Sequence, residues 1–275
     1  MSSDKHSETP KKALQALQLS YAYAAGGPLV LNGLSADVEA GEFVGVLGTN
    51  GTGKSTLLRL LAGLLAPRSG RVLLNGRDIS ALSRRQIAGE LAFVPQDNSI
   101  WLPFTCREVV SMGRYARSSG WKYSAEDREI AEGCMRETRT LSLAGRRICE
   151  LSGGELQRVC IAQALAQETD ILMLDEPTSH LDICFQLEVM ELLAGLRLKK
   201  GLTVIAVLHD LNLAAKFCSR LLILKDGGIF ADGRPAEVLT ADNLRRVFRV
   251  EADIAAEGEL PRIYLRSSSR ESGEA

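Results

Sequence analysis

The segment GTNGTGKST, residues 48–56, has the residue types and spacing of a phosphate-binding loop. It matches the pattern G-x-x-x-x-G-K-[ST], directly after the apolar run FVGVL and before the helical run TLLRLLAGL. Glycines let backbone N–H groups surround a phosphate, a lysine reaches the β/γ oxygens, and a hydroxyl binds Mg²⁺. The segment therefore predicts binding of a nucleoside triphosphate. The candidate binding residues are Gly48, Asn50, Gly51, Thr52, Gly53, Lys54, Ser55 and Thr56.

Two adjacent carboxylates, Asp175 and Glu176, follow the apolar run ILML. An acid at the end of a strand beside a phosphate loop can hold the metal, directly or through water. The next residue can orient and deprotonate an attacking water. Because unpaired buried charge is costly, two carboxylates at this position favour chemistry over packing. Asp175 and Ser55 are therefore candidate metal ligands, and Glu176 is the candidate base.

Two further polar side chains follow apolar runs in the same way. His209 comes after TVIAVL, which places it at the same predicted edge of the sheet as Asp175. A histidine there can contact the γ-phosphate, although a structural histidine is the alternative interpretation. Gln96 follows LAFVP, and its residue type alone carries little information.

The segment LSGGELQR, residues 151–158, predicts a second anion site. Ser152 is a good helix N-cap, and Gly153 and Gly154 leave the N–H groups of the first turn uncovered. A helix N-terminus of this kind attracts anions through its free N–H groups and its dipole. The chain thus contains two predicted phosphate sites about a hundred residues apart.

Short apolar runs alternate with helical patterns along the chain, which predicts an α/β fold. The runs at 43–47, 171–174 and 203–208 show little alternation, as expected of central parallel strands covered on both faces. Residues 221–233 indicate a hairpin around Asp226 and Gly227.

One domain is expected over residues 13–265, with a helical subdomain inserted at about 97–162. The polar segments 1–12 and 266–275 are predicted to be disordered tails.

The composition excludes several classes of protein. With 33 basic and 34 acidic side chains, the chain offers no basic excess for nucleic acid. No apolar run approaches the ~18–20 residues that a membrane span needs, and the N-terminus lacks the apolar segment of a secretion signal. The chain is therefore expected to be cytosolic, without a nucleic-acid partner. The six scattered cysteines are expected to be free, mostly buried thiols, and the three histidines are too dispersed to predict a zinc site.

Taken together, these motifs resemble the ATP-binding cassette (ABC) family over residues 13–250. In family order they are the phosphate loop 48–56, the Q-loop residue Gln96, the signature 151–158, the metal and base pair within 172–176, the D-loop 179–182 and the switch histidine His209. The resemblance implies the α/β P-loop NTPase fold of ABC ATPases. That fold has a central, mostly parallel sheet, an antiparallel β subdomain and an inserted helical subdomain.

The resemblance also implies ATP and Mg²⁺ as cofactors and assigns further residues to them. Tyr23 falls where the family stacks an aromatic ring on adenine, and Asp182 of the D-loop becomes a nucleotide contact. The implied catalytic residues are Glu176, His209, Gln96 and Lys54. The implied metal ligands are Ser55, Gln96 and Asp175.

In that family two cassettes associate head to tail, and each signature helix binds the γ-phosphate held by the other cassette. Ser152, Gly153 and Gly154 would therefore bind the ATP of a partner. Because the chain has one set of motifs, a second copy or a relative must supply the other set. A homodimer is the expected state.

Three segments look like the ATPase subunits of bacterial importers for iron–siderophore complexes, haem and cobalamin: 104–116, 181–193 and 207–233. Cys106 departs from the usual residue of the family, and His180 of the D-loop is given no catalytic role. The resemblance implies a separate membrane permease, an indirect periplasmic binding protein and a peripheral location at the cytoplasmic face of the inner membrane.

The segment 98–108 places Ile100, Trp101, Leu102 and Phe104 in a short apolar run broken by Pro103, which predicts an exposed loop. Trp101 in that run is predicted to dock the permease. The alternative is that Trp101 folds back over the helical subdomain.

Two other functions remain compatible with the motifs. One is an ABC-type ATPase that is not coupled to transport and acts in cluster assembly, translation or DNA repair. The other is a nucleotide-binding module without turnover, against which Glu176 argues. The cargo is left open, because the permease and the binding protein select it.

Overall fold

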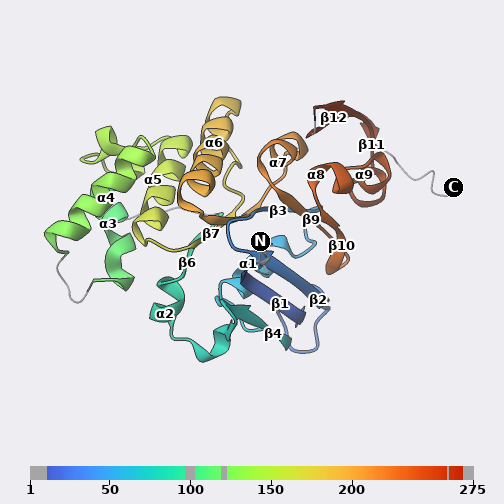
Figure 1. Ribbon diagram of the computed structural model, residues 1–275, viewed down its shortest axis with the longest axis horizontal. Helices are drawn as coiled ribbons and strands as arrows, with labels where there is room; N and C mark the ends of the chain where they lie inside the picture. The colour runs from blue at the N-terminus through green and yellow to red at the C-terminus, as the bar shows by residue number, and fades with distance from the viewer. Residues whose placement is uncertain (1–10, 97–102, 119–122, 259, 269–275) are drawn as a thin grey trace, which may run out of the picture.

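The computed structural model describes residues 11–96, 103–118, 123–258 and 260–268. Figure 1 shows three regions around a central sheet: helices α3, α4 and α5 on the left, an antiparallel sheet with β1 and β2 below, and the β11–β12 hairpin at the upper right. Trp101, the predicted permease contact, lies outside the described residues.

The central sheet has six strands in the order β10-β9-β3-β8-β7-β6, and every neighbouring pair except β10–β9 is parallel. Its strands are β3 (Phe43–Leu47), β6 (Leu91–Val94), β7 (Ile171–Asp175), β8 (Thr203–Val207), β9 (Arg220–Lys225) and β10 (Gly228–Gly233). The three parallel strands predicted from their apolar runs are confirmed. So is the hairpin around Asp226 and Gly227.

Side chains of the central strands alternate between two apolar cores. On β3, Phe43 and Leu47 pack into the core formed with α5, α6 and α7. Val44 and Val46 pack into the opposite core, formed with α1 and the strands β1 and β2. Figure 1 shows α6 and α7 above the sheet and α1 below it. The low alternation in the sequence is therefore explained by burial on both faces.

Helices of varied length pack on this sheet. They are α1 (Lys54–Leu61), α2 (Arg84–Ala88), α6 (Ile183–Lys200), α7 (Leu211–Phe217), α8 (Pro235–Val238) and α9 (Ala241–Phe248). The 3₁₀ turn η1 (Ile79–Ala81) precedes α2, and the turns η2 (Gly113–Ala116), η3 (Leu141–Leu143) and η4 (Ile148–Glu150) lie in the helical part of the chain. All six cysteines are free, and four of them are buried, as expected.

Helices α3 (Cys106–Met112), α4 (Ala125–Glu137) and α5 (Gly153–Ala166) share an apolar core of their own. The boundary predicted at residue 162 is wrong, because it falls inside α5. This helix belongs to both parts of the fold: Val159 and Ala162 face the helical core, and Cys160 and Ile161 face the sheet.

Two predicted tail boundaries also need correction. Lys12 begins β1, and β12 extends to Ser268, three residues into the segment predicted to be a tail. Lys12 pairs with Glu39, and Ser268 pairs with Val250. The backbone hydrogen bonds of this pairing order both segments, although their polar composition predicted disorder. The hairpin consists of β11 (Val250–Glu257) and β12 (Leu260–Ser268).

The antiparallel sheet has the strand order β2-β1-β4-β5. Its strands are β1 (Lys12–Tyr21), β2 (Leu31–Glu39), β4 (Ser69–Leu74) and β5 (Arg77–Asp78).

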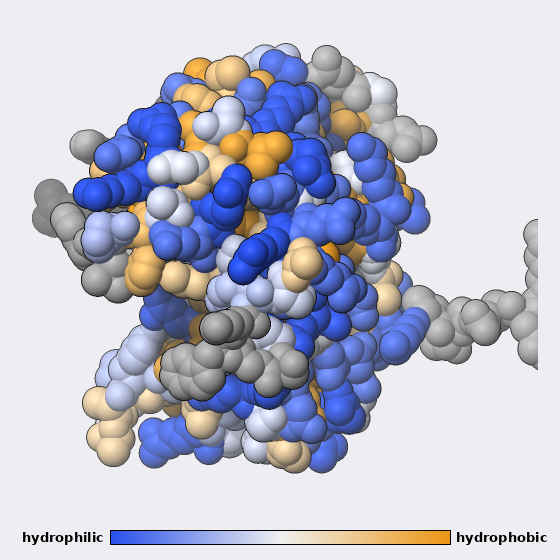
Figure 2. Space-filling view, turned by 90° about the vertical axis from the view of Figure 1, so that its left-hand side faces the viewer, coloured by the Kyte–Doolittle hydropathy of each residue, from blue (hydrophilic) through white to orange (hydrophobic). Residues whose placement is uncertain are grey.

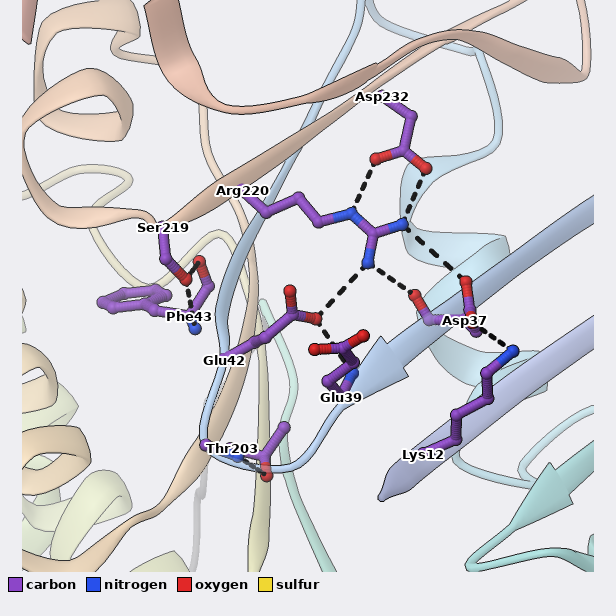
Figure 3. A network of polar contacts seen from close by, with 10 residues as sticks. Lys12, Asp37, Glu39, Glu42, Phe43, Thr203, Ser219, Arg220 and Asp232 are labelled. Carbon is purple, nitrogen blue, oxygen red and sulfur yellow. Dashed lines mark hydrogen bonds and ion pairs between the residues drawn. The ribbon is translucent and has the colours of Figure 1, made fainter. Parts of the chain in front are cut away.

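A charged network around Arg220 of β9 joins this sheet to the central sheet (Figure 3). The guanidinium donates two hydrogen bonds to Asp232, at 2.7 and 2.8 Å, and one to the backbone oxygen of Asp37, at 3.2 Å. Glu42 lies 3.4 Å away. The carboxylates, Asp232 foremost, raise the pKa of Arg220, and the hydrogen bond from Lys12 lowers the pKa of Asp37. Arg220 therefore connects β2, β9 and β10 through charge-assisted bonds.

Replacing Arg220 with methionine should lower the free energy of unfolding by about 1–3 kcal/mol, because three carboxylates lose a partly buried cation. Urea denaturation of Arg220→Met measures this loss. Arg128→Met, which changes an exposed arginine on α4, is the matched control and should change stability little. Equal stability of the two variants would show that the network does not hold the sheets together.

Candidate functional site

Three parallel strands bring the predicted site residues to one edge of the central sheet. The phosphate loop follows β3, Asp175 ends β7, and His209 comes two residues after β8. The strands are in register, since Val207 of β8 pairs with Val46 on one side and with Asp175 on the other. The carboxyl ends of these strands open on a hollow of about 640 Å³. Its lining residues are Tyr23, Val30, Asn50, Gly51, Gly53, Lys54, Ser55, Thr56, Gln96, Glu176, Ser179, His180 and His209.

The backbone of the phosphate loop requires glycine at defined positions. Gly48 has φ +149°, and a Cβ there would lie 2.6 Å from the backbone oxygen of Leu224. Gly51 has φ +82°, in the left-handed region, although space around it is open. Helix α1 then begins at Lys54, and no side chain caps its N-terminus. An uncapped N-terminus that faces a hollow leaves N–H groups for an anion.

Lys54 is a buried cation whose hydrogen bonds go to backbone carbonyls. Its side chain is nearly inaccessible, and Nζ donates to the oxygens of Gly48 and Thr49, both at 2.9 Å. Burial lowers the pKa of this ammonium, while the charges of Glu176 and Asp175 oppose the shift. The ammonium is thus held at the floor of the loop, where a phosphate can bind it.

Ser55 and Asp175 form a contact that suits a magnesium ion. Ser55 Oγ donates to Asp175 Oδ1 at 2.8 Å, and Asp175 is 1% exposed. Burial raises the pKa of Asp175, and its second oxygen, Oδ2, is buried without a hydrogen-bond partner. An unpartnered buried carboxylate oxygen is costly, and hydroxyl and carboxylate oxygens are ligands that Mg²⁺ accepts. The donor set therefore fits the ion.

No group of three or more His, Cys, Asp or Glu side chains that could enclose a metal ion occurs in the described part of the chain. Mg²⁺ is commonly bound through one or two carboxylates together with substrate phosphates and water, so Ser55 and Asp175 remain suitable ligands.

Glu176 is held by two side chains from different strands. Gln96 Nε2 donates to Oε2 at 2.8 Å, and His209 Nε2 lies 2.7 Å from Oε1. The backbone of Glu176 is in the left-handed region, at φ +54°, and its carbonyl accepts hydrogen bonds from the backbone N–H and hydroxyl of Ser179. Such strain is typical of functional sites. The carboxylate faces the hollow and can accept a proton from water.

Tyr23 places an aromatic ring on the hollow. Its hydroxyl lies 2.9 Å from Thr56 Oγ1, and its ring packs edge-on against Tyr21. The side chain is 63% exposed, so one ring face is accessible to a planar ligand.

The signature residues lie away from this hollow. Ser152 caps α5: its hydroxyl accepts from the N–H of Glu155, whose carboxylate accepts from the Ser152 N–H at 2.9 Å. Asp182 likewise caps α6, accepting from the N–H of Phe185 at 3.1 Å. None of Ser152, Gly153, Gly154 and Asp182 is among the described residues that line the hollow. The predicted N-cap is confirmed, and the signature residues and the hollow lie in separate parts of one chain.

Sequence reasoning missed the role of Phe185. It attributed both signature glycines to an open helix N-terminus, but a Cβ on Gly154 would lie 2.8 Å from the Phe185 ring. At Gly153 the nearest atom would be 3.8 Å away. Sequence reasoning identified residues 179–182 as the D-loop but gave neither Ser179 nor His180 a role, although both line the hollow. Their position directly after the carboxylate pair was the available signal.

Residues 31–179 match the ABC transporter family. An iron(3+)-hydroxamate import ATP-binding protein of Bacillus subtilis is 39% identical over 246 residues, which cover 89% of this chain and 91% of that protein. A hemin import ATP-binding protein of Bordetella pertussis is 42% identical over 256 residues, which cover 90% and 96%.

The fold is similar to that of a dimeric ATP-binding cassette solved in a post-hydrolysis state with ADP and Pi. The TM-score is 0.73 at 30% identity, over 81% of this chain and 98% of the other.

Replacing Lys54 with alanine should weaken nucleotide binding by roughly 10²-fold, because the β/γ charge loses its buried cation. Titration with a fluorescent ATP analogue measures the loss. Lys216→Ala, which changes an exposed lysine on α7, is the control and should bind normally. Normal binding by folded Lys54→Ala protein would contradict the phosphate-loop assignment.

Replacing Glu176 with glutamine should leave nucleotide binding intact and slow hydrolysis by about 10²–10⁴-fold, because an amide cannot accept the proton of water. Phosphate release at saturating Mg-ATP measures the rate. The control Glu191→Gln, at an exposed position of α6, should hydrolyse normally. An unchanged kcat in Glu176→Gln would assign the base to another residue.

Proposed function

The chain belongs to the ABC transporter family, and we propose that it is the ATP-hydrolysing subunit of a bacterial importer for an iron–siderophore complex, haem or cobalamin. One observation carries the ATPase assignment: Asp175 presents an unpartnered buried oxygen beside Ser55, next to the buried ammonium of Lys54. These groups match the charges of a nucleoside triphosphate and Mg²⁺.

Different residues of the hollow bind the nucleotide, hold the metal ion and activate water. Lys54 and the free N–H groups of α1 bind the β/γ-phosphates, and Tyr23 stacks on the adenine. Ser55, Asp175 and Gln96 would hold Mg²⁺, which neutralises charge on the phosphates when bound. Glu176 orients water and takes its proton, and His209, already in contact with Glu176, contacts the γ-phosphate.

We place the second half of each ATP site on another copy of the chain. Ser152 and Gly153 are exposed, and they lie away from the hollow of their own chain. In a head-to-tail homodimer, Ser152, Gly153 and Gly154 bind the γ-phosphate of the partner copy, with Asp182 as a further contact. This arrangement explains why one chain has two phosphate sites.

Transport requires a membrane partner for this chain. No helix in the residues that the structure describes is both long enough and apolar enough to span a bilayer. Because the relatives are import ATP-binding proteins, we place the dimer at the cytoplasmic face of the inner membrane, bound to a permease that receives cargo from a periplasmic binding protein. An ABC-type ATPase uncoupled from transport is the alternative.

We propose that the permease docks where the helical part meets the central sheet. A groove of about 240 Å³ lies there, and its lining includes Pro95, Met112 and Tyr115. Tyr115 is 76% exposed, and aromatic side chains frequently dominate binding surfaces. Figure 2 shows this side of the molecule, which is hollowed between its upper and lower parts. The predicted docking residue Trp101 stays a prediction, since it lies outside the described residues.

Replacing Tyr115 with alanine should weaken permease binding by roughly thirtyfold, as expected for loss of a ~2 kcal/mol aromatic contact, while basal ATP hydrolysis persists. Pull-down with the cognate membrane permease measures the loss. Tyr264→Ala, on β12, is a matched exposed aromatic control. Equal pull-down of both variants would contradict docking at this groove.

A further inference from the structure

Helix α6 supports the N-terminus of the signature helix α5 through one aromatic ring. Phe185 lies in the first turn of α6, and its ring covers the position where a Cβ of Gly154 would stand, 2.8 Å from Cγ. Leu181, just before α6, makes a looser contact, 3.8 Å from the corresponding position on Gly153. The second glycine of the signature is therefore required by packing against Phe185.

Arg158 holds this ring from the same helix as Gly154. Its guanidinium carbon lies 4.9 Å from the centre of the Phe185 ring. Nη1 lies 2.6 Å from Glu188 Oε2, one turn further along α6. Arg158 Nε is buried without a hydrogen-bond partner. Arg158 thus packs against the ring although its Nε donor makes no hydrogen bond. This is expected where a cation–π contact determines the position of the guanidinium.

The same segment of chain leads back to the site of hydrolysis. The carbonyl of Glu176 binds Ser179, and Asp182 caps α6 only three residues before Phe185. Phe185 is thus placed between the turn that carries the base and the N-terminus of the signature helix α5.

We propose that Phe185 and Arg158 are positioning residues for the phosphate-binding turn of α5, and that they act on the ATP held by the partner copy. This inference rests on the head-to-tail dimer proposed above. Phe185 fixes the position of Ser152–Gly154 through its packing against Gly154. Each copy thereby adjusts the site of the other.

The test is hydrolysis by Phe185→Ala, alone and in mixed dimers. Alone, the variant should bind ATP as a monomer with unchanged affinity and hydrolyse it about 10–100-fold more slowly, because displacement of a binding group by ~1 Å costs up to about 10²-fold. Phe185→Tyr keeps the ring and should restore hydrolysis. Leu198→Ala, an exposed change at the far end of α6, should leave it unchanged.

Mixed dimers separate action on the partner from action within the chain. In a mixed dimer of the Phe185→Ala and Lys54→Ala chains, one ATP site combines the intact phosphate loop of the Phe185→Ala chain with the intact signature of the Lys54→Ala chain. Activity should therefore return. In a mixed dimer of the Phe185→Ala and Ser152→Arg chains, each chain carries a defective signature, so both ATP sites are defective. Activity should therefore stay low. The opposite pattern would show that Phe185 acts in its own chain, and failure with both partners would show a general folding defect. Either result overturns the proposal.

Arg158→Gln keeps a polar side chain but loses the cation, and it should give the same complementation pattern with a smaller loss. Activity equal to that of the unmodified protein would remove Arg158 from the proposal. The reference mixture of Lys54→Ala with Ser152→Arg should recover activity. No recovery there, with mixed dimers present, would overturn the dimer itself and the inference with it. If the reference mixture recovers activity, but Phe185→Ala recovers activity with Ser152→Arg and not with Lys54→Ala, the inference is overturned and the dimer is not.

Discussion

The parallel register of β3, β7 and β8 is the constraint on which the site depends. Because Val207 pairs with both Val46 and Asp175, the phosphate loop, the carboxylate pair and His209 emerge at one edge of the sheet. The burial of these strands on both faces holds the register, since a slip of one residue would exchange the two apolar cores. Chemistry at the edge thus follows from packing in the interior.

The site places unfavourable features together where a ligand can compensate for them. Lys54 is a buried cation bound to carbonyls, Asp175 has a buried oxygen without a partner, and Glu176 has a left-handed backbone. Each feature costs stability in the free protein. A bound polyphosphate with Mg²⁺ would provide opposite charge to Lys54 and a partner to Asp175. Nucleotide binding is therefore expected to stabilise the fold.

Sequence alone predicted the parts that depend on local pattern. The three strands that lead to Lys54, Asp175 and His209 were recognisable in the sequence as apolar runs. Ser152 was recognisable as a helix N-cap. Contacts between distant segments were not visible. The packing of Phe185 on Gly154 joins helices α6 and α5, and Arg220 joins two sheets. Such contacts depend on tertiary arrangement, which the residue types of either segment do not encode alone. The predicted boundary of the helical subdomain at residue 162 fell inside α5 for the same reason, because two cores share that helix.

The central claim is that one chain holds ATP in its phosphate loop and a second copy closes the site with its signature helix. The most direct measurement is the molar mass of the Glu176→Gln protein by light scattering at saturating Mg-ATP. The molar mass of Glu176→Gln should double when ATP is added. The double variant Glu176→Gln/Ser152→Arg should still bind ATP but keep the molar mass of a monomer. A mass that stays monomeric in Glu176→Gln, or that doubles regardless of Ser152→Arg, would contradict the shared site.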